Sequence, residues 1–209
     1  GTFNAAIAAL AMLLAHGLFK AALFLVVGII DHQAGTRDVR ELSGLWRSAP
    51  KLFVVSAIAT ASMAGLPPLY GFVAKEAVLA ALVEEATTPA GVWVLASVVV
   101  GSALTVAYSA RFLWGAFATK PGLGATRFKP VDWSFLAAPA VLSALSVAVA
   151  FALPPVEATV SAYAGLFPAA EEPLHLALWH GVTPEFGLSA LAIAGGLALF
   201  LLRGPVGRL

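Results

Sequence analysis

The stretch Gly65-Leu66-Pro67-Pro68-Leu69-Tyr70-Gly71 interrupts an apolar run that extends over residues 50–85. A straight helix of that length would measure about 54 Å, far more than the hydrocarbon core of a bilayer, which is about 30 Å thick. Pro67 and Pro68 cannot donate backbone hydrogen bonds, and Gly65 and Gly71 tolerate unusual backbone dihedral angles. The sequence therefore predicts a membrane-spanning helix that is broken in its middle.

Four further apolar runs are long enough to cross a bilayer. They cover residues 3–30, 91–118, 133–153 and 185–202. The whole chain is 60% hydrophobic and 11% charged, with a mean hydropathy of +0.92, whereas soluble domains are about 45–50% apolar and about 25% charged. We therefore expect an all-α integral membrane protein with five transmembrane helices, the second of them discontinuous.

The charged residues and the cysteine count exclude several classes of function. Twelve basic and 11 acidic residues give a net charge of +1, which offers no surface to a polyanion, so nucleic acid is not expected as a partner. Without cysteine these 209 residues form no disulfide, thiolate metal site or iron–sulfur cluster. We expect neither a metal nor a cofactor. Because the first apolar run begins at Phe3, we also expect the chain to be part of a longer polypeptide.

The basic residues outside the apolar interior predict how the chain crosses the membrane. Ten of the twelve lie near or after the ends of the first, third and fifth runs: Arg37, Arg40, Arg47, Lys51, Arg111, Lys120, Arg127, Lys129, Arg203 and Arg208. The other two connections carry acidic residues instead: Glu84, Glu85, Glu157, Glu171 and Glu172. All ten basic residues lie on one side only if the broken segment crosses once, and basic loops are typical of the cytoplasmic side.

We therefore predict a single interrupted crossing at residues 50–85 and a multi-pass membrane protein whose basic loops face the cytoplasm. Prolines shorten every apolar run within residues 154–184. This connector is expected to form short amphipathic helices at the outer membrane interface. Residues 185–209 would supply the fifth span and a cytoplasmic tail.

Two lysines, Lys20 and Lys75, lie inside the apolar runs. A cation in hydrocarbon costs about 2.5–3.5 kcal/mol, so such residues face a protein interior or a hydrated cavity and mark ion pathways. His16 precedes Lys20 by four residues, which places both side chains on one helix face, where an imidazole and an amine can share a proton. From the residues alone two readings stay open: a proton pathway, or lysines that only pair with carboxylates of neighbouring helices.

Two motifs, taken in order, resemble a known family. Residues 15–25, with His16 and Lys20, and residues 63–76, with the helix break and Lys75, resemble the proton-conducting antiporter subunits. These subunits are shared by respiratory complex I, membrane-bound hydrogenases and Mrp-type multisubunit sodium/proton antiporters.

Within that family the chain is most similar to the large A-type subunit of the Mrp antiporters. Residues 28–38 and 178–181 carry this resemblance. Complex I subunits tend to have a second histidine where this chain has Met12. The D-type Mrp subunit tends to have a glutamate where this chain has Lys75. Both departures favour the A-type subunit.

The resemblance implies a fold of two inverted five-helix repeats, each with a broken helix, and residues 1–153 would supply most of the second repeat. It implies that Lys20 lies on a central axis of proton transfer and that His16 is its relay partner. Lys75 would carry the proton where the path turns outward. Three further residues are candidates for the pathway or its entry: Glu76, Asp31 and His32.

The implied function is ion transport and not enzymatic catalysis. The chain would pass protons as one part of a complex with other membrane subunits in the lipid bilayer, and Na⁺ is a second candidate ion. The resemblance leaves one alternative, a membrane-arm subunit of complex I or of a membrane-bound hydrogenase, in which electron transfer in soluble subunits would drive the same movement.

Overall fold

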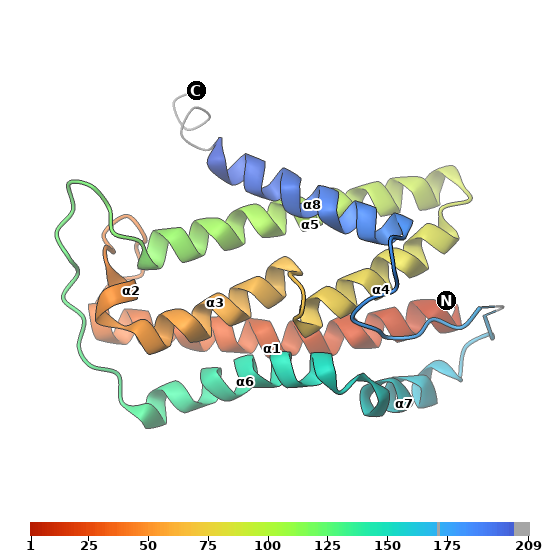
Figure 1. Cartoon of the computed structure of the whole chain (residues 1–209), viewed down its shortest axis with the longest axis horizontal. Helices are drawn as coiled ribbons and strands as arrows, with labels where there is room; N and C mark the ends of the chain where they lie inside the picture. Colours follow the sequence, from red (N-terminus) through yellow and green to blue (C-terminus); the bar gives the residue numbers. More distant parts are fainter. Residues whose placement is uncertain (171, 203–209) are drawn as a thin grey trace.

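A computed structural model describes residues 1–170 and 172–202, and every regular element within these residues is a helix (Figure 1). The helices are α1 (Phe3–Ala34), α2 (Leu45–Ser48), α3 (Pro50–Ala64), α4 (Tyr70–Glu85), α5 (Pro89–Phe117), α6 (Trp133–Phe151), α7 (Leu153–Ala164) and α8 (Pro184–Leu201). The predicted all-α membrane fold is confirmed. Glu171, Arg203 and Arg208, which entered the predicted topology, lie outside the described residues.

Four helices, α1, α5, α6 and α8, are each long and apolar enough to cross a membrane alone. They begin and end within four residues of the predicted runs. α3 and α4 have 15 and 16 residues, and at about 23–24 Å each they are short for a crossing. Figure 1 shows that α4 continues in the direction of α3 toward the opposite end of the bundle. That the two cross together as a fifth span stays a prediction.

The two ends of the bundle differ in charge. We call one the basic end, formed by residues 35–49 and 118–132, and the other the acidic end, formed by residues 86–88, 152–170 and 172–183 (Figure 1). In these connections and the adjoining helix turns, the basic end has seven lysine and arginine residues against four carboxylates. The described part of the acidic end has five glutamates and neither lysine nor arginine.

Two exposed tryptophans lie near the two ends of α5. Trp93 and Trp114 are both exposed, at 74% and 49%, and their separation of 21 positions corresponds to about 31 Å of helix, close to the hydrocarbon thickness. Tryptophan is enriched where a membrane meets water. Trp46 in α2 and Trp133 at the start of α6 lie at the same end as Trp114 (Figure 1). These positions support a bilayer whose faces lie at the basic and acidic ends.

The sidedness of the two ends is tested by single cysteines at positions 40, 85 and 127, which are all exposed. If the basic end is cytoplasmic, a membrane-impermeant maleimide added to intact cells labels position 85 and spares positions 40 and 127. Permeabilised cells serve as the control, because all three positions then react. Labelling of position 40 or 127 in intact cells would overturn the topology.

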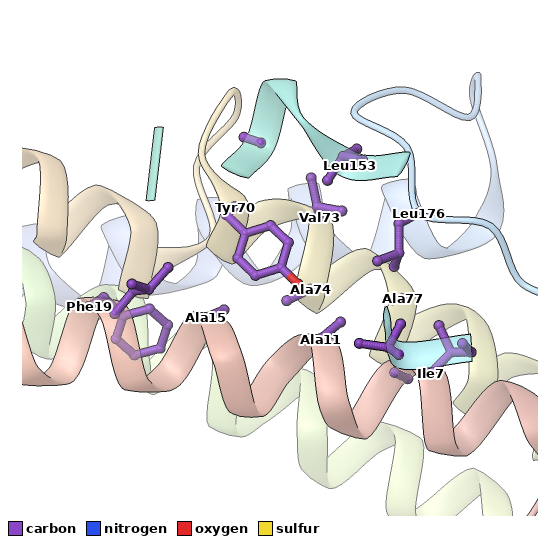
Figure 2. Packing of buried hydrophobic residues seen from close by; sticks show 14 of the residues in the cluster. Ile7, Ala11, Ala15, Phe19, Tyr70, Val73, Ala74, Ala77, Leu153 and Leu176 are labelled. Atoms are coloured by element: carbon purple, nitrogen blue, oxygen red, sulfur yellow. The ribbon is translucent and has the colours of Figure 1, made fainter. Parts of the chain in front are cut away.

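α1 is the central helix and packs against α3, α4, α6 and α7. Its buried face contains small residues such as Ala11 and Ala15, which are almost fully buried. Figure 2 shows this face of α1 against Val73, Ala74 and Ala77 of α4. Small side chains let two helices approach closely, which matters in lipid, where burying apolar surface gives no advantage. The close packing fixes the orientation of α4, which carries Lys75 and Glu76.

α8 lies directly on α5 (Figure 1). The contact depends on Gly196, because a Cβ atom there would lie only 2.4 Å from the backbone oxygen of Ala103 in α5. α8 also packs against α4. This arrangement brings Ser189, from the far end of the sequence, beside the broken helix.

The connector after α6 contains one short helix, α7, and the described residues from 165 to 183 form no other. α6 ends at Phe151, and Pro154 and Pro155 fall in the first turn of α7, where a missing backbone N–H leaves no hydrogen bond unmade. The placement of the connector at the outer interface stays a prediction.

Candidate functional site

The helix break consists of residues 65–69, between α3 and α4. Gly65 ends α3 with φ +79°, the left-handed conformation that glycine adopts without strain. Pro67 and Pro68 follow in the non-helical segment, and Gly71 lies in the first turn of α4. The helix is thus broken at the residues from which the sequence predicts the break.

The side chain of Lys75 extends from α4 to the last residue of α3. Its Nζ donates a hydrogen bond of 3.1 Å to the carbonyl oxygen of Ala64. In a continuous helix that oxygen would accept from the backbone N–H four residues later, but this residue is Pro68, which has none. Gly65 leaves room for the lysine, since a Cβ atom there would lie 2.6 Å from Cδ of Lys75. The break and the lysine therefore form one structural unit.

A small void lies beside this unit. It measures about 10 Å³ and is bounded by Lys75 and Gly65, by Ser102 of α5 and by Ser189 of α8, and such a volume is about that of one water-sized probe. The hydroxyl of Ser189 donates a hydrogen bond to Oε1 of Glu76. Ser189 is thus shared between the surroundings of Lys75 and those of the neighbouring carboxyl group.

Glu76 connects the broken helix to a large cavity at the acidic end. Its side chain is only 5% exposed, yet it forms part of the wall of a cavity of about 650 Å³. The other polar and ionisable residues of the wall are Asn4, Glu84, Glu172, His175, His180 and Glu185. A buried carboxyl group at the base of a polar cavity is suited to exchange protons or cations with the water outside.

Asn4 holds the connector over this cavity. Its Nδ2 donates to Oε2 of Glu84 at 2.8 Å and to the backbone oxygen of Glu172 at 3.0 Å. Its Oδ1 accepts from the backbone N–H of Leu174 at 2.8 Å. One amide therefore links α1, the end of α4 and the connector. A second contact, from Nδ1 of His175 to Glu157 of α7 at 2.7 Å, fixes the connector farther out.

Lys20 and His16 lie on an open face of α1. Within the described residues, no hydrogen bond joins their two side chains. Nζ of Lys20 is 5.9 Å from the ring centroid of Tyr108 in α5. The Tyr108 hydroxyl points to Sδ of Met63 at 3.6 Å, and Met63 precedes the Ala64 that binds the second lysine. The imidazole of His16 is exposed and stacks on Phe19, with ring centroids 5.5 Å apart. The end of α3 thus lies between the surroundings of the two lysines.

Asp31 and His32 lie in the last turn of α1 at the basic end, far from the cavity. Oδ2 of Asp31 is 2.7 Å from a guanidinium nitrogen of Arg37. Through its hydrogen bond and its charge this carboxylate raises the pKa of Arg37. His32 contacts the edge of Phe135. The structure therefore does not bring these two residues together with Lys75 and Glu76.

Sequence reasoning missed the residues that surround the lysines. Ser189 and Asn4 contact the site from other helices, and no pattern in the sequence relates them to it. The hydroxyl of Ser62, near the end of α3, shares a hydrogen bond of 2.7 Å with the hydroxyl of Ser146 in α6. Three buried hydroxyls have no hydrogen-bond partner within the described protein: Thr60, Tyr70 and Ser109. Figure 2 shows Tyr70 reaching from α4 toward α1.

Several curated proteins similar to this chain are named as antiporter subunits. The chain is 32% identical to the A subunit of the Na(+)/H(+) antiporter of Alkalihalophilus pseudofirmus, over 95% of this chain and 26% of that protein. It is 34% identical to the corresponding Na(+)/H(+) antiporter A subunit of Bacillus subtilis, over 94% and 26%. It is 32% identical to a probable K(+)/H(+) antiporter A/B subunit of Rhizobium meliloti, over 97% and 21%. The chain thus spans about a quarter of the length of the curated relatives it matches.

The fold has a counterpart among solved structures. A chain of the Mrp complex from Dietzia sp. DQ12-45-1b superimposes with a TM-score of 0.82 at 35% sequence identity, over 100% of this chain and 22% of that one. A family model described as NADH:quinone oxidoreductase/Mrp antiporter, TM, matches residues 1–105, which include α1, the break and Lys75. The resemblance expected from the sequence is confirmed: this chain belongs to the NADH:quinone oxidoreductase/Mrp antiporter transmembrane family.

Proposed function

We propose that this chain is the proton-conducting second repeat of the A-type subunit of a multisubunit sodium/proton antiporter. The observation that carries the proposal is the broken helix, where Lys75 binds the free carbonyl of Ala64 and the next residue, Glu76, reaches a polar cavity. Two of the three relatives described above are named as A subunits of sodium/proton antiporters, which supports the choice of ions.

The proposed path runs along the membrane from Lys20 to Lys75 and then outward. His16 would relay protons to Lys20 on the open face of α1. The end of α3 lies between the two lysines. On one side, Tyr108 contacts both Lys20 and Met63. On the other side, the carbonyl oxygen of Ala64 accepts a hydrogen bond from Lys75. Asp31 and His32 lie nearer the basic end of α1 and would belong to an entry from that side.

The outward step would pass from Lys75 to Glu76. The two side chains share Ser189, which borders the void beside the lysine and donates to the carboxyl group of Glu76. From Glu76 the polar cavity opens at the acidic end, where several glutamates and histidines form its wall. This geometry supports proton release on the outer side of the membrane.

The surroundings of the lysines argue against a merely structural role. A lysine that only braces a helix bundle is expected to pair with a carboxylate, because an unpaired cation in hydrocarbon is costly. Within the described part of the chain, Lys20 and Lys75 form no ion pair with a carboxylate. A carbonyl oxygen holds the ammonium of Lys75 and does not take its proton, so this contact leaves the lysine free to release it.

The full protein would act as a secondary transporter subunit with other membrane subunits in a bacterial inner membrane, with the basic end in the cytoplasm. The transported ions would be H⁺ and Na⁺, without a cofactor. The alternative, a membrane-arm subunit of complex I or of a membrane-bound hydrogenase, would use the same residues. Quinone or iron–sulfur subunits that copurify with the protein would favour that alternative.

Glu76→Gln tests the outward step. Glutamine still accepts a hydrogen bond from Ser189, so the fold is retained, but it does not bind a proton. We expect sodium/proton exchange to fall about tenfold or more, since a positioned proton-transfer group contributes roughly 10²–10⁴-fold. The measurement is the collapse of a pH gradient by Na⁺ in everted vesicles that contain the full-length subunit in its complex.

The matched control is Glu85→Gln. Glu85 lies on the same helix and is exposed, but it does not border the cavity. The Glu85→Gln variant should exchange sodium for protons at the wild-type rate. Equal activity of both variants, at equal amounts of assembled complex, would contradict the proposed release path through Glu76.

A further inference from the structure

A groove at the basic end has no role in the proposed proton path. It measures about 550 Å³, within the range of about 300–1,000 Å³ that is common for small-molecule sites. Its inner wall is formed by Phe53 of α3, Phe117 of α5 and Phe200 of α8. The wall is therefore mostly apolar and aromatic, and it is built from three helices that are distant in the sequence.

Arg47 supplies a positive charge at one edge of this groove. Its guanidinium lies over the ring of Trp46, 4.7 Å from the ring centroid. The ring is held in place because its Nε1 donates to Oγ1 of Thr119 at 3.1 Å. A stacked guanidinium keeps its hydrogen-bond donors free for a planar or tetrahedral anion.

Arg47 differs from the other arginines of the same loop. Arg37 pairs with Asp31 at 2.7 Å, and Arg40 pairs with Asp38 at 2.6 Å. Within the described residues, no carboxylate lies within 4.0 Å of Arg47. Lys120, the nearby lysine, is also engaged, since its Nζ donates to three backbone oxygens, those of Val39, Leu42 and Gly115. Arg47 is thus a cation at the basic end that is available to an external anion.

The depth of the groove fits a ligand with an anionic head and an apolar tail. Trp114, which marks the membrane interface on α5, lies on its wall. The wall continues to Ala110, one helical turn deeper, or about 6 Å. Arg47 is therefore level with the headgroups, and the wall from Trp114 to Ala110 faces the start of the hydrocarbon. The excess of basic over acidic residues at this end favours anionic lipids over neutral ones.

We propose that this groove binds an anionic phospholipid, with the phosphate on Arg47 and an acyl chain against Phe53, Phe117 and Phe200. The site does not depend on the proton path, because its residues lie at the end of the bundle opposite the Glu76 cavity (Figure 1). A lipid at this position would fasten the short helix α2 to α5 and α8.

The test uses the full-length protein in its complex, reconstituted in lipid nanodiscs. The probe is phosphatidylglycerol with a photoreactive diazirine on one acyl chain, and cross-linked peptides are identified by mass spectrometry. We expect labelling of the peptides that contain Phe53, Phe117 or Phe200. The same diazirine probe with a phosphatidylcholine headgroup should label them about fivefold less, because one basic residue contributes roughly this factor to binding an anionic lipid.

Two variants separate a specific site from the lipid that surrounds any membrane protein. Arg47→Gln should lower the labelling by phosphatidylglycerol about fivefold, to the level of phosphatidylcholine. Arg37→Gln removes an exposed arginine of the same loop that is already paired with Asp31, and it should leave the labelling unchanged.

Three outcomes would overturn the proposal. Equal labelling by both probes in the wild-type protein would indicate unspecific lipid contact. An equal loss in Arg37→Gln and Arg47→Gln would indicate a general effect of charge. Cross-links from this groove to a helix of another subunit, in place of lipid, would show that a protein covers it.

Discussion

Replacement of Lys20 by alanine is expected to abolish sodium/proton exchange while the complex still assembles. Lys20 lies within a membrane-spanning helix, half-buried beside Tyr108 and without a carboxylate partner in the described part of the chain. Alanine has no nitrogen to bind and release a proton, so the path is interrupted at its central residue. The substitution also removes a cation from an apolar environment, which avoids the cost of its desolvation and favours assembly.

Lys20→Arg distinguishes proton transfer from a requirement for positive charge. Arginine retains the charge but stays protonated in proteins, so it is not able to pass a proton on. We expect this variant to lose exchange nearly as completely as Lys20→Ala. Lys129→Ala, which removes an exposed lysine of the loop before α6, is the matched control and should behave like the wild type.

The measurement is pH-gradient-driven sodium/proton exchange in everted vesicles with equal amounts of assembled complex. Near-normal exchange in Lys20→Ala would exclude this chain as the proton path and would favour the reading in which its lysines are structural. Full activity in Lys20→Arg, together with loss in Lys20→Ala, would show that charge and not proton transfer is required.

The arrangement of helices was predictable from the sequence because the membrane limits the possible structures. Long apolar runs form helices in lipid, since every backbone polar group must be satisfied within the segment. The break was predictable for the converse reason, because Pro67 and Pro68 remove donors that the helix needs. The position at which α1 ends was harder to predict. It extends to Ala34, because Gly35 ends the helix in a left-handed conformation and its N–H donates to the carbonyl oxygen of Asp31 at 2.8 Å.

The candidate site was predictable only as far as single residues stand out from their surroundings. Lys20 and Lys75 are conspicuous because charges are rare in apolar runs. Their partners are not conspicuous, because Asn4 and Ser189 are ordinary polar residues in other helices. Their roles depend on which helices lie side by side, and this depends on packing details such as the close contact of Gly196 with Ala103. The local sequence contains no signal for such contacts.

The stacking of His16 illustrates the same limit. Helical spacing places His16 and Lys20 on one face of α1, and both lie on its open side. The spacing does not determine what the imidazole contacts, and the structure has it stacked on Phe19. Its role as a relay partner of Lys20 therefore depends on how the ring moves or on groups beyond this chain, and it stays a proposal.

Gly71→Ala is expected to disrupt the broken helix itself. Gly71 lies in the first turn of α4, and its backbone N–H donates to Oγ of Ser62 in α3 at 3.2 Å. A Cβ atom at position 71 would lie 1.9 Å from the backbone oxygen of Ser62 and 2.7 Å from its carbonyl carbon. Both are backbone atoms of a packed helix, which do not move aside as a flexible side chain would.

α4 would therefore have to separate from α3, and the hydrogen bond to Ser62 would be lost with the contact. Overpacking of this kind costs about 3 kcal/mol or more. Because Lys75 and Glu76 lie on the same helix, the separation would also displace Lys75 from the carbonyl oxygen of Ala64. We expect much less assembled complex and no measurable exchange by the fraction that remains.

Gly101→Ala is the matched control for this prediction. Gly101 lies within α5, and a Cβ atom there meets no other atom within 4 Å. Alanine is the better helix former by about 1 kcal/mol, so this variant should be as stable as the wild type or more so. Thermal stability is measured by size-exclusion chromatography of the solubilised complex after heating. If both Gly71→Ala and Gly101→Ala keep the wild-type melting temperature, α3 and α4 do not pack as closely as in this structure.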